Sequence, residues 1–237
     1  MRHLVIAASL CWTAAASAAP DPAPRFAPQP LAGPYAVPGD YCNAEHVPID
    51  RCEVTTDLDA DHVAAPFQAV AKILIITDDQ MHFPRASLAL QVGGQWYVLP
   101  DIGEAGAGHG GGHSLAFRMA GARLVVDWTS SIGRFGHDDE TAIIVCGVGA
   151  ADHRPRCTGP IVTSQLTVTD HCAKDPDCTR RPTATSSFRC VATLRGDVLD
   201  ITDDRKPLRN PDAEQTLPPR LGACATHGLA GAHKLAF

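Results

Sequence analysis

The amino-acid sequence predicts an all-β fold: an antiparallel sandwich or barrel of short strands, stapled by disulfides, behind a signal peptide and a Pro-rich linker. Three observations lead to this prediction. Short apolar runs recur between Gly, Pro and Asp residues, the chain contains nine cysteines, and the N-terminus has the composition of a secretory signal. We expect residues 1–18 to be the signal peptide, 19–40 a Pro/Ala-rich linker and 41–237 one disulfide-bonded, β-rich domain.

The first 18 residues have the three parts of a signal peptide. Arg2 and His3 form a short basic region, residues 4–16 are almost entirely apolar, and Ala16-Ser17-Ala18 is a small-residue cleavage site. A helix that spans a membrane needs roughly 20 apolar residues, so this stretch is predicted to be cleaved rather than to anchor the chain. Since no later stretch is apolar enough, we expect no transmembrane segment after signal cleavage.

Residues 19–40 are rich in proline and alanine and poor in large apolar side chains. The prolines are Pro20, Pro22, Pro24, Pro28, Pro30, Pro34 and Pro38. Such a composition favours an extended chain that does not pack and acts as a spacer. The folded domain is therefore predicted to begin near Tyr41.

From Tyr41 onward the apolar pattern is typical of strands. The candidate strands span residues 71–77, 88–92, 96–99, 115–119, 124–128, 142–148, 161–169, 188–194 and 198–202. Gly93-Gly94 predicts a tight hairpin turn, because both glycines tolerate positive φ. Arg195-Gly196-Asp197 predicts a second turn. Residues 59–70 are the best candidate for a helix.

The cysteines indicate a disulfide framework. One of them, Cys11, lies in the signal, and the remaining eight are Cys42, Cys52, Cys146, Cys157, Cys172, Cys178, Cys190 and Cys224. An even number in an exported chain is typical of disulfides, whereas zinc sites favour C-x2-C pairs, which this sequence lacks. Eight cysteines allow 105 connectivities. Local spacing favours the pairs Cys42–Cys52, Cys146–Cys157 and Cys172–Cys178, which leaves Cys190 with Cys224.

Charge and composition exclude some classes of function. The net charge is −6 and becomes −7 once Arg2 leaves with the signal, and no basic run exceeds Arg180-Arg181. A nucleic-acid partner is therefore not expected. Aromatic residues make up 5% of the chain, which argues against a sugar-binding face of stacked aromatic rings. The excess of arginine over lysine is typical of a GC-rich genome and, with the signal, predicts a bacterial protein exported to the periplasm or the extracellular space.

The glycine-rich stretch at residues 103–116 is similar to two motifs of lipases and esterases. The run from His109 to Gly112 resembles their oxyanion loop. The run from Gly112 to Ala116 resembles a G-x-S-x-G nucleophile elbow whose last glycine is replaced by alanine. The resemblance implies a small secreted serine esterase with Ser114 as its nucleophile and His227 or His233 as its base. An elbow needs a helix after the serine, whereas residues 115–119 have the alternation of a strand.

The same stretch permits two other interpretations. His109 and His113 could bind a metal together with His137 or His82, as in a periplasmic metal-binding domain. Alternatively, the stretch is a solvent-exposed loop between hairpins. Three acidic runs, at residues 78–79, 137–140 and 203–204, could offer oxygen ligands to calcium. They lack the spacing of a calcium loop and favour strand-ending turns.

Taken together, these patterns favour an exported, non-catalytic β-domain that binds an unidentified ligand or an envelope partner and needs no cofactor. The alternatives are the esterase that uses Ser114 and the metal-binding domain that uses His109 and His113.

Overall fold

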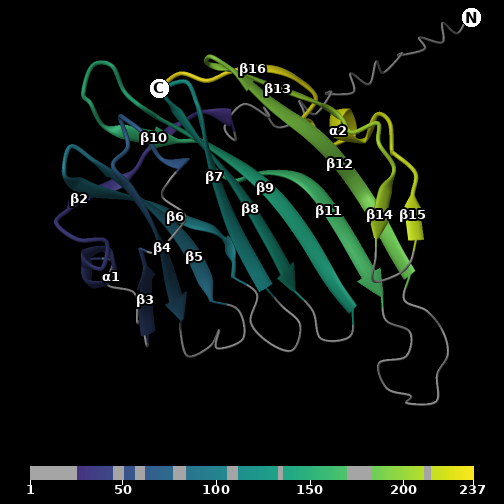
Figure 1. The fold of residues 1–237 in the computed structure, drawn as a ribbon, viewed down its shortest axis with the longest axis horizontal. Coiled ribbons are helices and arrows are strands. Elements are labelled where there is room, and N and C mark those ends of the chain that lie inside the picture. Colours follow the sequence, from purple (N-terminus) through teal and green to yellow (C-terminus); the bar gives the residue numbers. More distant parts are fainter. Residues whose placement is uncertain are drawn as a thin grey trace, which may run out of the picture.

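The structure, a computed structural model, describes residues 26–44, 51–56, 62–76, 84–105, 112–132, 136–169, 183–210 and 215–237. Within these residues the strands form a nine-stranded sheet, a five-stranded sheet and a two-stranded ladder, with every pairing antiparallel. The larger sheet curves into a half-barrel, and the smaller one packs beside it (Figure 1). The predicted all-β class is therefore confirmed.

The five-stranded sheet has the order β2-β6-β5-β4-β3. Its strands are β2 (Ala32–Tyr35), β3 (Arg51–Thr55), β4 (Ala69–Ile76), β5 (Arg85–Val92) and β6 (Gln95–Glu104). The short helix α1 (Asp40–Ala44) carries Tyr41 onto the outer face of this sheet, where it packs with Ile73 and Trp96. The hairpin between β5 and β6 turns at Gly93 and Gly94, whose φ angles are 60° and 78°. Both values lie in the left-handed region that the turn requires, as predicted.

The nine-stranded sheet has the order β1-β10-β9-β11-β12-β13-β16, with β8 paired to β9 and β7 paired to β8. Its strands are β1 (Gln29–Pro30), β7 (Gly112–Ala120), β8 (Arg123–Ile132), β9 (Gly136–Val148), β10 (Pro155–Cys157), β11 (Ile161–Thr169), β12 (Thr183–Arg195), β13 (Val198–Asp203) and β16 (Gly231–Lys234). β14 (Leu208–Asn210) and β15 (Gln215–Leu217) form the separate ladder. The predicted turn between β12 and β13 is confirmed at Gly196, which has a φ of 59°.

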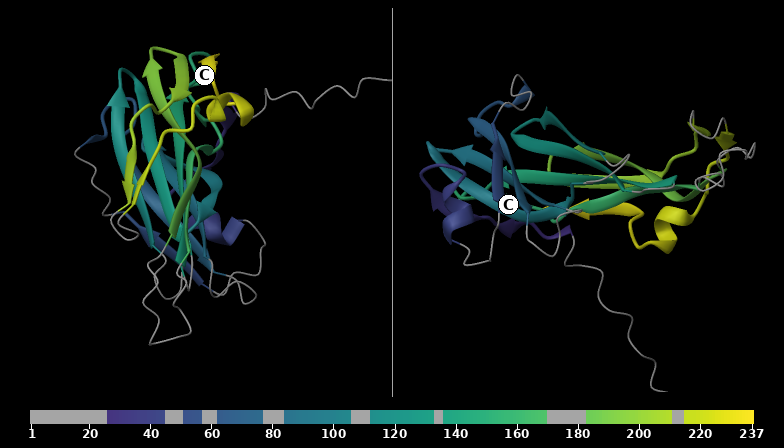
Figure 2. Two further views of the ribbon diagram at one scale, coloured as in Figure 1. Left: turned by 90° about the vertical axis from the view of Figure 1, so that its right-hand side faces the viewer. Right: turned by 90° about the horizontal axis from the view of Figure 1, so that it is seen from below.

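Two apolar cores lie on opposite faces of β8 and β9. Leu124, Val126 and Trp128 point into the first core, which lies between the two sheets. Val125 points into the second core, where the C-terminal segment covers the half-barrel with Leu229 and Leu235. This alternation follows from the two-residue period of a strand. Figure 2 shows the five-stranded sheet at one end of the molecule and the C-terminal segment, in yellow, on the nine-stranded sheet.

The C-terminal segment is attached through the helix α2 (Ala223–Thr226). The Asp203 carboxylate, at the end of β13, accepts hydrogen bonds from the backbone N–H groups of Gly222 (2.6 Å) and Cys224 (3.0 Å). These hydrogen bonds, first the one from Gly222 and then the one from Cys224, lower the pKa of Asp203. Neither described helix is long and apolar enough to cross a membrane.

Three predicted disulfides are confirmed. Cys42–Cys52, Cys146–Cys157 and Cys190–Cys224 are paired, with Cα–Cα distances of 6.3, 4.1 and 6.0 Å. Cys11, Cys172 and Cys178 lie outside the described residues. Cys146 and Cys157 face each other across the β9–β10 ladder. The other two bridges each join a helix to a strand: Cys42 of α1 to Cys52 of β3, and Cys224 of α2 to Cys190 of β12.

The predicted spacer is wrong over its described part, residues 26–40. Phe26 and Leu31 are each 7% exposed and belong to the second and first cores. β1 pairs with β10, and β2 pairs with β6. Pro30 is compatible with this packing because β1 is an edge strand. An edge strand pairs on one side, so its other side needs no backbone N–H donor. The folded domain therefore begins before Tyr41, and residues 19–25 lie outside the described part.

The predicted helix is also wrong where the structure describes it. Residues 62–70 contain no α-helix, and β4 already begins at Ala69. Pro66 lies in the middle of the predicted helix, where proline removes a backbone donor and clashes with the preceding turn. Phe67, at 2% exposure, instead packs into the first core as the chain enters β4.

Candidate ligand-binding hollow

Four polar side chains form a row across the nine-stranded sheet. Thr129 of β8 is directly opposite Thr141 of β9, Thr141 is opposite Ser164 of β11, and Ser164 is opposite Arg189 of β12. Directly opposed residues of antiparallel strands project to the same face and lie close together. The register therefore places these four residues next to one another across the sheet. We call these four residues the polar row.

The polar row lines a hollow of about 460 Å³. The other lining residues are Asp139, Thr163, Leu166, Cys190, Asp204 and Leu208. Ile143, Thr141 and Asp139 project to the same face of β9. Ile143 packs in the second core, whereas Thr141 and Asp139 line the hollow, so the hollow begins where the apolar core ends. Its volume lies within the range of about 300–1,000 Å³ that small-molecule sites occupy.

A β-bulge adds one more hydroxyl group to the hollow. The pairing of β11 with β9 shifts between Val162 and Ser164, which leaves Thr163 as the extra residue. Its hydroxyl donates a hydrogen bond to the carbonyl oxygen of Thr141 (3.2 Å). Bulges of this kind redirect a side chain and are common beside functional sites.

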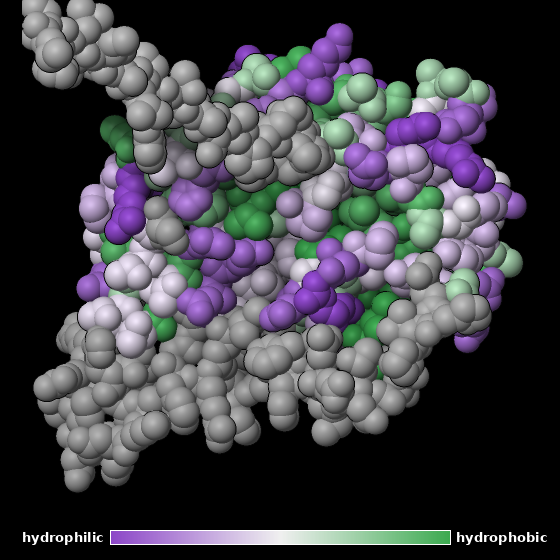
Figure 3. Space-filling model, turned by 180° about the vertical axis from the view of Figure 1, so that it is seen from behind, coloured by the Kyte–Doolittle hydropathy of each residue, from purple (hydrophilic) through white to green (hydrophobic). Residues whose placement is uncertain are grey.

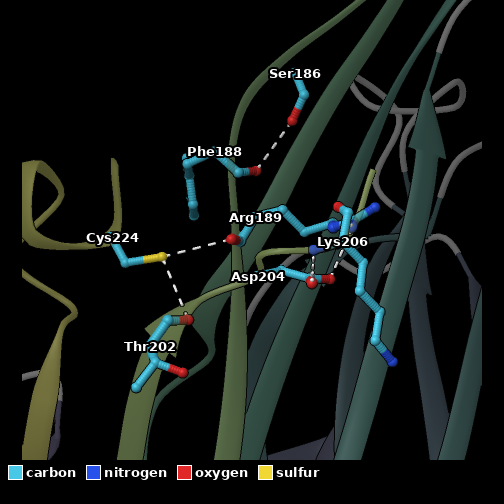
Figure 4. A network of polar contacts seen from close by, with 7 residues as sticks. All are labelled: Ser186, Phe188, Arg189, Thr202, Asp204, Lys206 and Cys224. Atoms are coloured by element: carbon cyan, nitrogen blue, oxygen red, sulfur yellow. Dashed lines mark hydrogen bonds and ion pairs between the residues drawn. The ribbon is translucent and has the colours of Figure 1, made fainter. Parts of the chain in front are cut away.

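Arg189 is held by a compact set of partners at one side of the hollow (Figure 4). Its Nη2 lies 2.8 Å from Oδ2 of Asp204 and donates to the carbonyl oxygen of Lys206 (2.5 Å). Asp204 in turn accepts from the backbone N–H of Lys206 (2.9 Å). The side chains of Arg189 and Asp204 are 21% and 19% exposed. The guanidinium is therefore paired, and the hollow does not present it as a lone cation to an anionic ligand.

The sulfur of Cys224 lies close to two backbone carbonyl oxygens, one on β12 and one on β13 (Figure 4). Its Sγ lies 3.5 Å from the carbonyl oxygen of Arg189 and 3.7 Å from that of Thr202. Because Cys224 is in a disulfide with Cys190, its sulfur carries no proton, and these approaches are packing contacts. Of the two bridged cysteines, Cys190 lines the hollow.

The sequence-predicted His113 lies away from the hollow, between the two sheets. Its Nε2 is 2.7 Å from Nζ of Lys72, and its Nδ1 is 3.2 Å from the carbonyl oxygen of Ala105. The ring stacks on Trp128 with a centroid distance of 5.5 Å. Burial, and then the charge of Lys72, lower the pKa of His113, while the hydrogen bond to Ala105 opposes them.

These contacts occupy both ring nitrogens of His113, so a metal would have to displace one of its partners. His109 and His82 lie outside the described residues, as does the side chain of His137. Among the residues that the structure describes, no group of three or more His, Cys, Asp or Glu side chains is placed to hold a metal ion.

Ser114 does not have the local structure of a nucleophile elbow. It is an exposed residue within β7, opposite Thr129, and the strand continues to Ala120. The candidate bases lie elsewhere. His227 stacks on Phe188, and His233 donates to the carbonyl oxygen of Leu229 (2.8 Å). Strands β8, β9, β11, β12 and β13 separate β7 from β16, which carries His233.

Two of the acidic residues considered for calcium have other roles. Asp203 caps α2, and Asp204 pairs with Arg189. Asp78 and Asp79 lie outside the described part of the chain, whereas Asp139 lines the hollow.

Comparisons of the chain with protein families, with curated proteins and with solved structures found no match.

Sequence reasoning missed the polar row. Thr129, Thr141 and Ser164 are ordinary strand residues, and no motif links them to Arg189. Only the strand order and register bring the four together. The sequence signal for this site is a threonine or serine in each of three strands, on the face that turns toward the hollow. These residues can be matched across the strands only when the register is known.

Proposed function

We propose that this protein is an exported, non-catalytic binding domain whose hollow takes a small, uncharged, hydroxyl-rich ligand such as a saccharide or another polyol. The polar row carries the proposal, because it aligns hydroxyl groups from successive strands within one hollow. A hydroxyl group both donates and accepts hydrogen bonds, so a row of them complements a ligand that also does both.

The charges around the hollow support an uncharged ligand. Arg189 is neutralised by Asp204, and the other charged lining residue is Asp139. The formal charge of these three residues is −1, which disfavours phosphates and carboxylates. Leu166 and Leu208 supply apolar surface for the carbon skeleton of the ligand. Recognition here would depend on hydrogen bonds rather than on stacking, since none of the described lining residues is aromatic.

The rest of the described surface favours a recessed polar site over an apolar docking face. Large apolar side chains that are exposed come from different strands and loops, namely Val37, Val54, Val191, Val198 and Leu221. On the face seen in Figure 3, hydrophobic and hydrophilic residues are interspersed. Such scattered apolar residues are normal for a protein surface.

Titration with saccharides tests the proposal. Backbone amide NMR spectra are recorded while glucose, maltose, cellobiose and mannitol are added, and we expect shifts centred on Thr141 and Ser164. Thr141→Val together with Ser164→Ala should weaken binding by about 10- to 100-fold, because each lost hydrogen bond is worth about 1 kcal/mol.

Thr193→Val is the matched control, because Thr193 is an exposed threonine of β12 that does not line the hollow. It should bind as the wild type does. Shifts that map elsewhere, or that survive the Thr141 and Ser164 substitutions, would reject the hollow as the site. Absence of shifts with all four compounds would reject the ligand class.

We also propose that the chain is a bacterial protein exported to the periplasm or the extracellular space after loss of residues 1–18. The three disulfides support an oxidising compartment. Expressed in a Gram-negative bacterium with its own leader, the protein should be recovered outside the cytoplasm with an N-terminus near Ala19. N-terminal sequencing and intact mass decide this, and an exported product that retains Met1 would contradict it.

A further inference from the structure

The contact between Lys72 and His113 joins the two sheets from within. Lys72 lies on β4 of the five-stranded sheet, and His113 lies on β7 of the nine-stranded sheet. The neighbours of Lys72 on the same face of β4 are Val70 and Leu74, which pack in the first core. The Lys72 side chain is half-buried, so its amine is in an apolar setting but is not sealed from solvent.

The hydrogen bonds of His113 fix its tautomer. Since the carbonyl oxygen of Ala105 can only accept, Nδ1 carries the proton and donates to it (3.2 Å). The lone pair of Nε2 therefore faces the Lys72 ammonium, which donates across 2.7 Å. A base is thus already placed to take a proton from Lys72.

The surroundings favour the uncharged forms of both groups. Burial lowers the pKa of Lys72, and the charge of Glu53 opposes this shift. The pKa of His113 is lowered by burial and by Lys72. The stacked ring of Trp128 shields His113 on one side, and Trp128 itself is 1% exposed. A lysine amine in such a setting is a better nucleophile than an exposed one.

We propose that Lys72 is a nucleophilic amine that captures small aldehydes as an imine, with His113 as its proton acceptor. This site is separate from the hollow and does not depend on the function proposed for it. The chemical class of ligand is set by the amine, because a neutral amine attacks carbonyl carbon readily.

The step is balanced without a redox partner. Nε2 of His113 takes a proton from the Lys72 ammonium, and the amine nitrogen then forms a bond to the carbonyl carbon. The oxygen receives the second proton of that nitrogen, which gives a carbinolamine. The imidazolium of His113 returns its proton to the hydroxyl group, which leaves as water while the C=N bond forms, so the product is a protonated imine that carries the original positive charge. Addition of water reverses the reaction.

The chain provides its own controls for a test. It has four lysines, of which Lys206 and Lys234 are described and exposed. The folded, disulfide-bonded protein is treated at pH 7 with benzaldehyde and sodium cyanoborohydride, which reduces any imine to a stable benzylamine. Peptide mass spectrometry after short times then gives the rate at each lysine.

We expect Lys72 to react about tenfold faster than Lys206 and Lys234, and His113→Gln to remove this advantage, since a positioned base contributes at least about tenfold to such a step. Lys206 in the same variant controls for the activity of the reagents, and the circular-dichroism spectrum shows whether the variant remains folded. If His113→Gln unfolds the protein, the comparison within the wild type still decides. A Lys72 rate equal to or below that of the exposed lysines would overturn the proposal, as would an unchanged Lys72 rate in folded His113→Gln.

Discussion

Replacing Cys190 and Cys224 together with alanine is expected to lower the free energy of unfolding by about 3–4 kcal/mol. The two cysteines are 34 residues apart, so their bridge restricts a long loop in the unfolded chain. It also ties α2 to β12, and with it the segment that covers the second core. Urea unfolding followed by tryptophan fluorescence measures the loss.

The bridge between Cys42 and Cys52 provides the matched control. Its cysteines are 10 residues apart, and in the chain-entropy account the shorter loop makes the expected loss about 1 kcal/mol smaller. If replacing Cys42 and Cys52 with alanine lowers the free energy of unfolding as much as replacing Cys190 and Cys224, loop length does not determine how much a bridge stabilises the fold. If neither variant loses stability, the bridges do not stabilise the fold.

Trp128→Ala is expected to cost about 3–5 kcal/mol of stability, because it removes a large side chain from the first core. Trp128→Phe should cost less than half as much. The indole Nε1 is buried and has no hydrogen-bond partner among the described residues, so no hydrogen bond is lost with it. A Cβ atom at Gly103 would lie 2.6 Å from this Nε1, which shows how closely the backbone of β6 approaches the ring.

Chemical denaturation of both variants, beside the wild type, tests the account. A Phe variant as unstable as the Ala variant would show that Nε1 has a partner that matters for stability. An Ala variant within about 1 kcal/mol of the wild type would contradict the placement of Trp128 in the core.

Local patterns predicted local structure well. A tight turn between two apolar runs requires positive φ at two consecutive positions, and Gly93-Gly94 tolerates it at both. The pairing of Cys146 with Cys157 is predicted correctly because they lie on β9 and β10, which are consecutive strands in the sequence. The linker prediction failed for a related reason. Seven prolines indicate a spacer, whereas the burial of Phe26 and Leu31 depends on strands more than 60 residues later.

Both candidate sites depend on contacts that no local pattern specifies. Lys72 and His113 are 41 residues apart and lie on different sheets. The polar row requires the order of four strands and the exact register of each pair, and a shift of one residue would turn the side chains of that strand to the other face. The sequence spacing pairs His113 with His109, whereas its partner in the structure is Lys72.

The alternation along β8 and β9 ties the two cores to one another. Val125 and Val126 are neighbours in the chain but pack in opposite cores. Neither core can therefore open without displacing β8 and β9, which both cores share. A cavity made on one side weakens the strands that support the other. Because the two cores share β8 and β9, we expect damage to either core to destabilise both, so that they unfold together in a single cooperative transition.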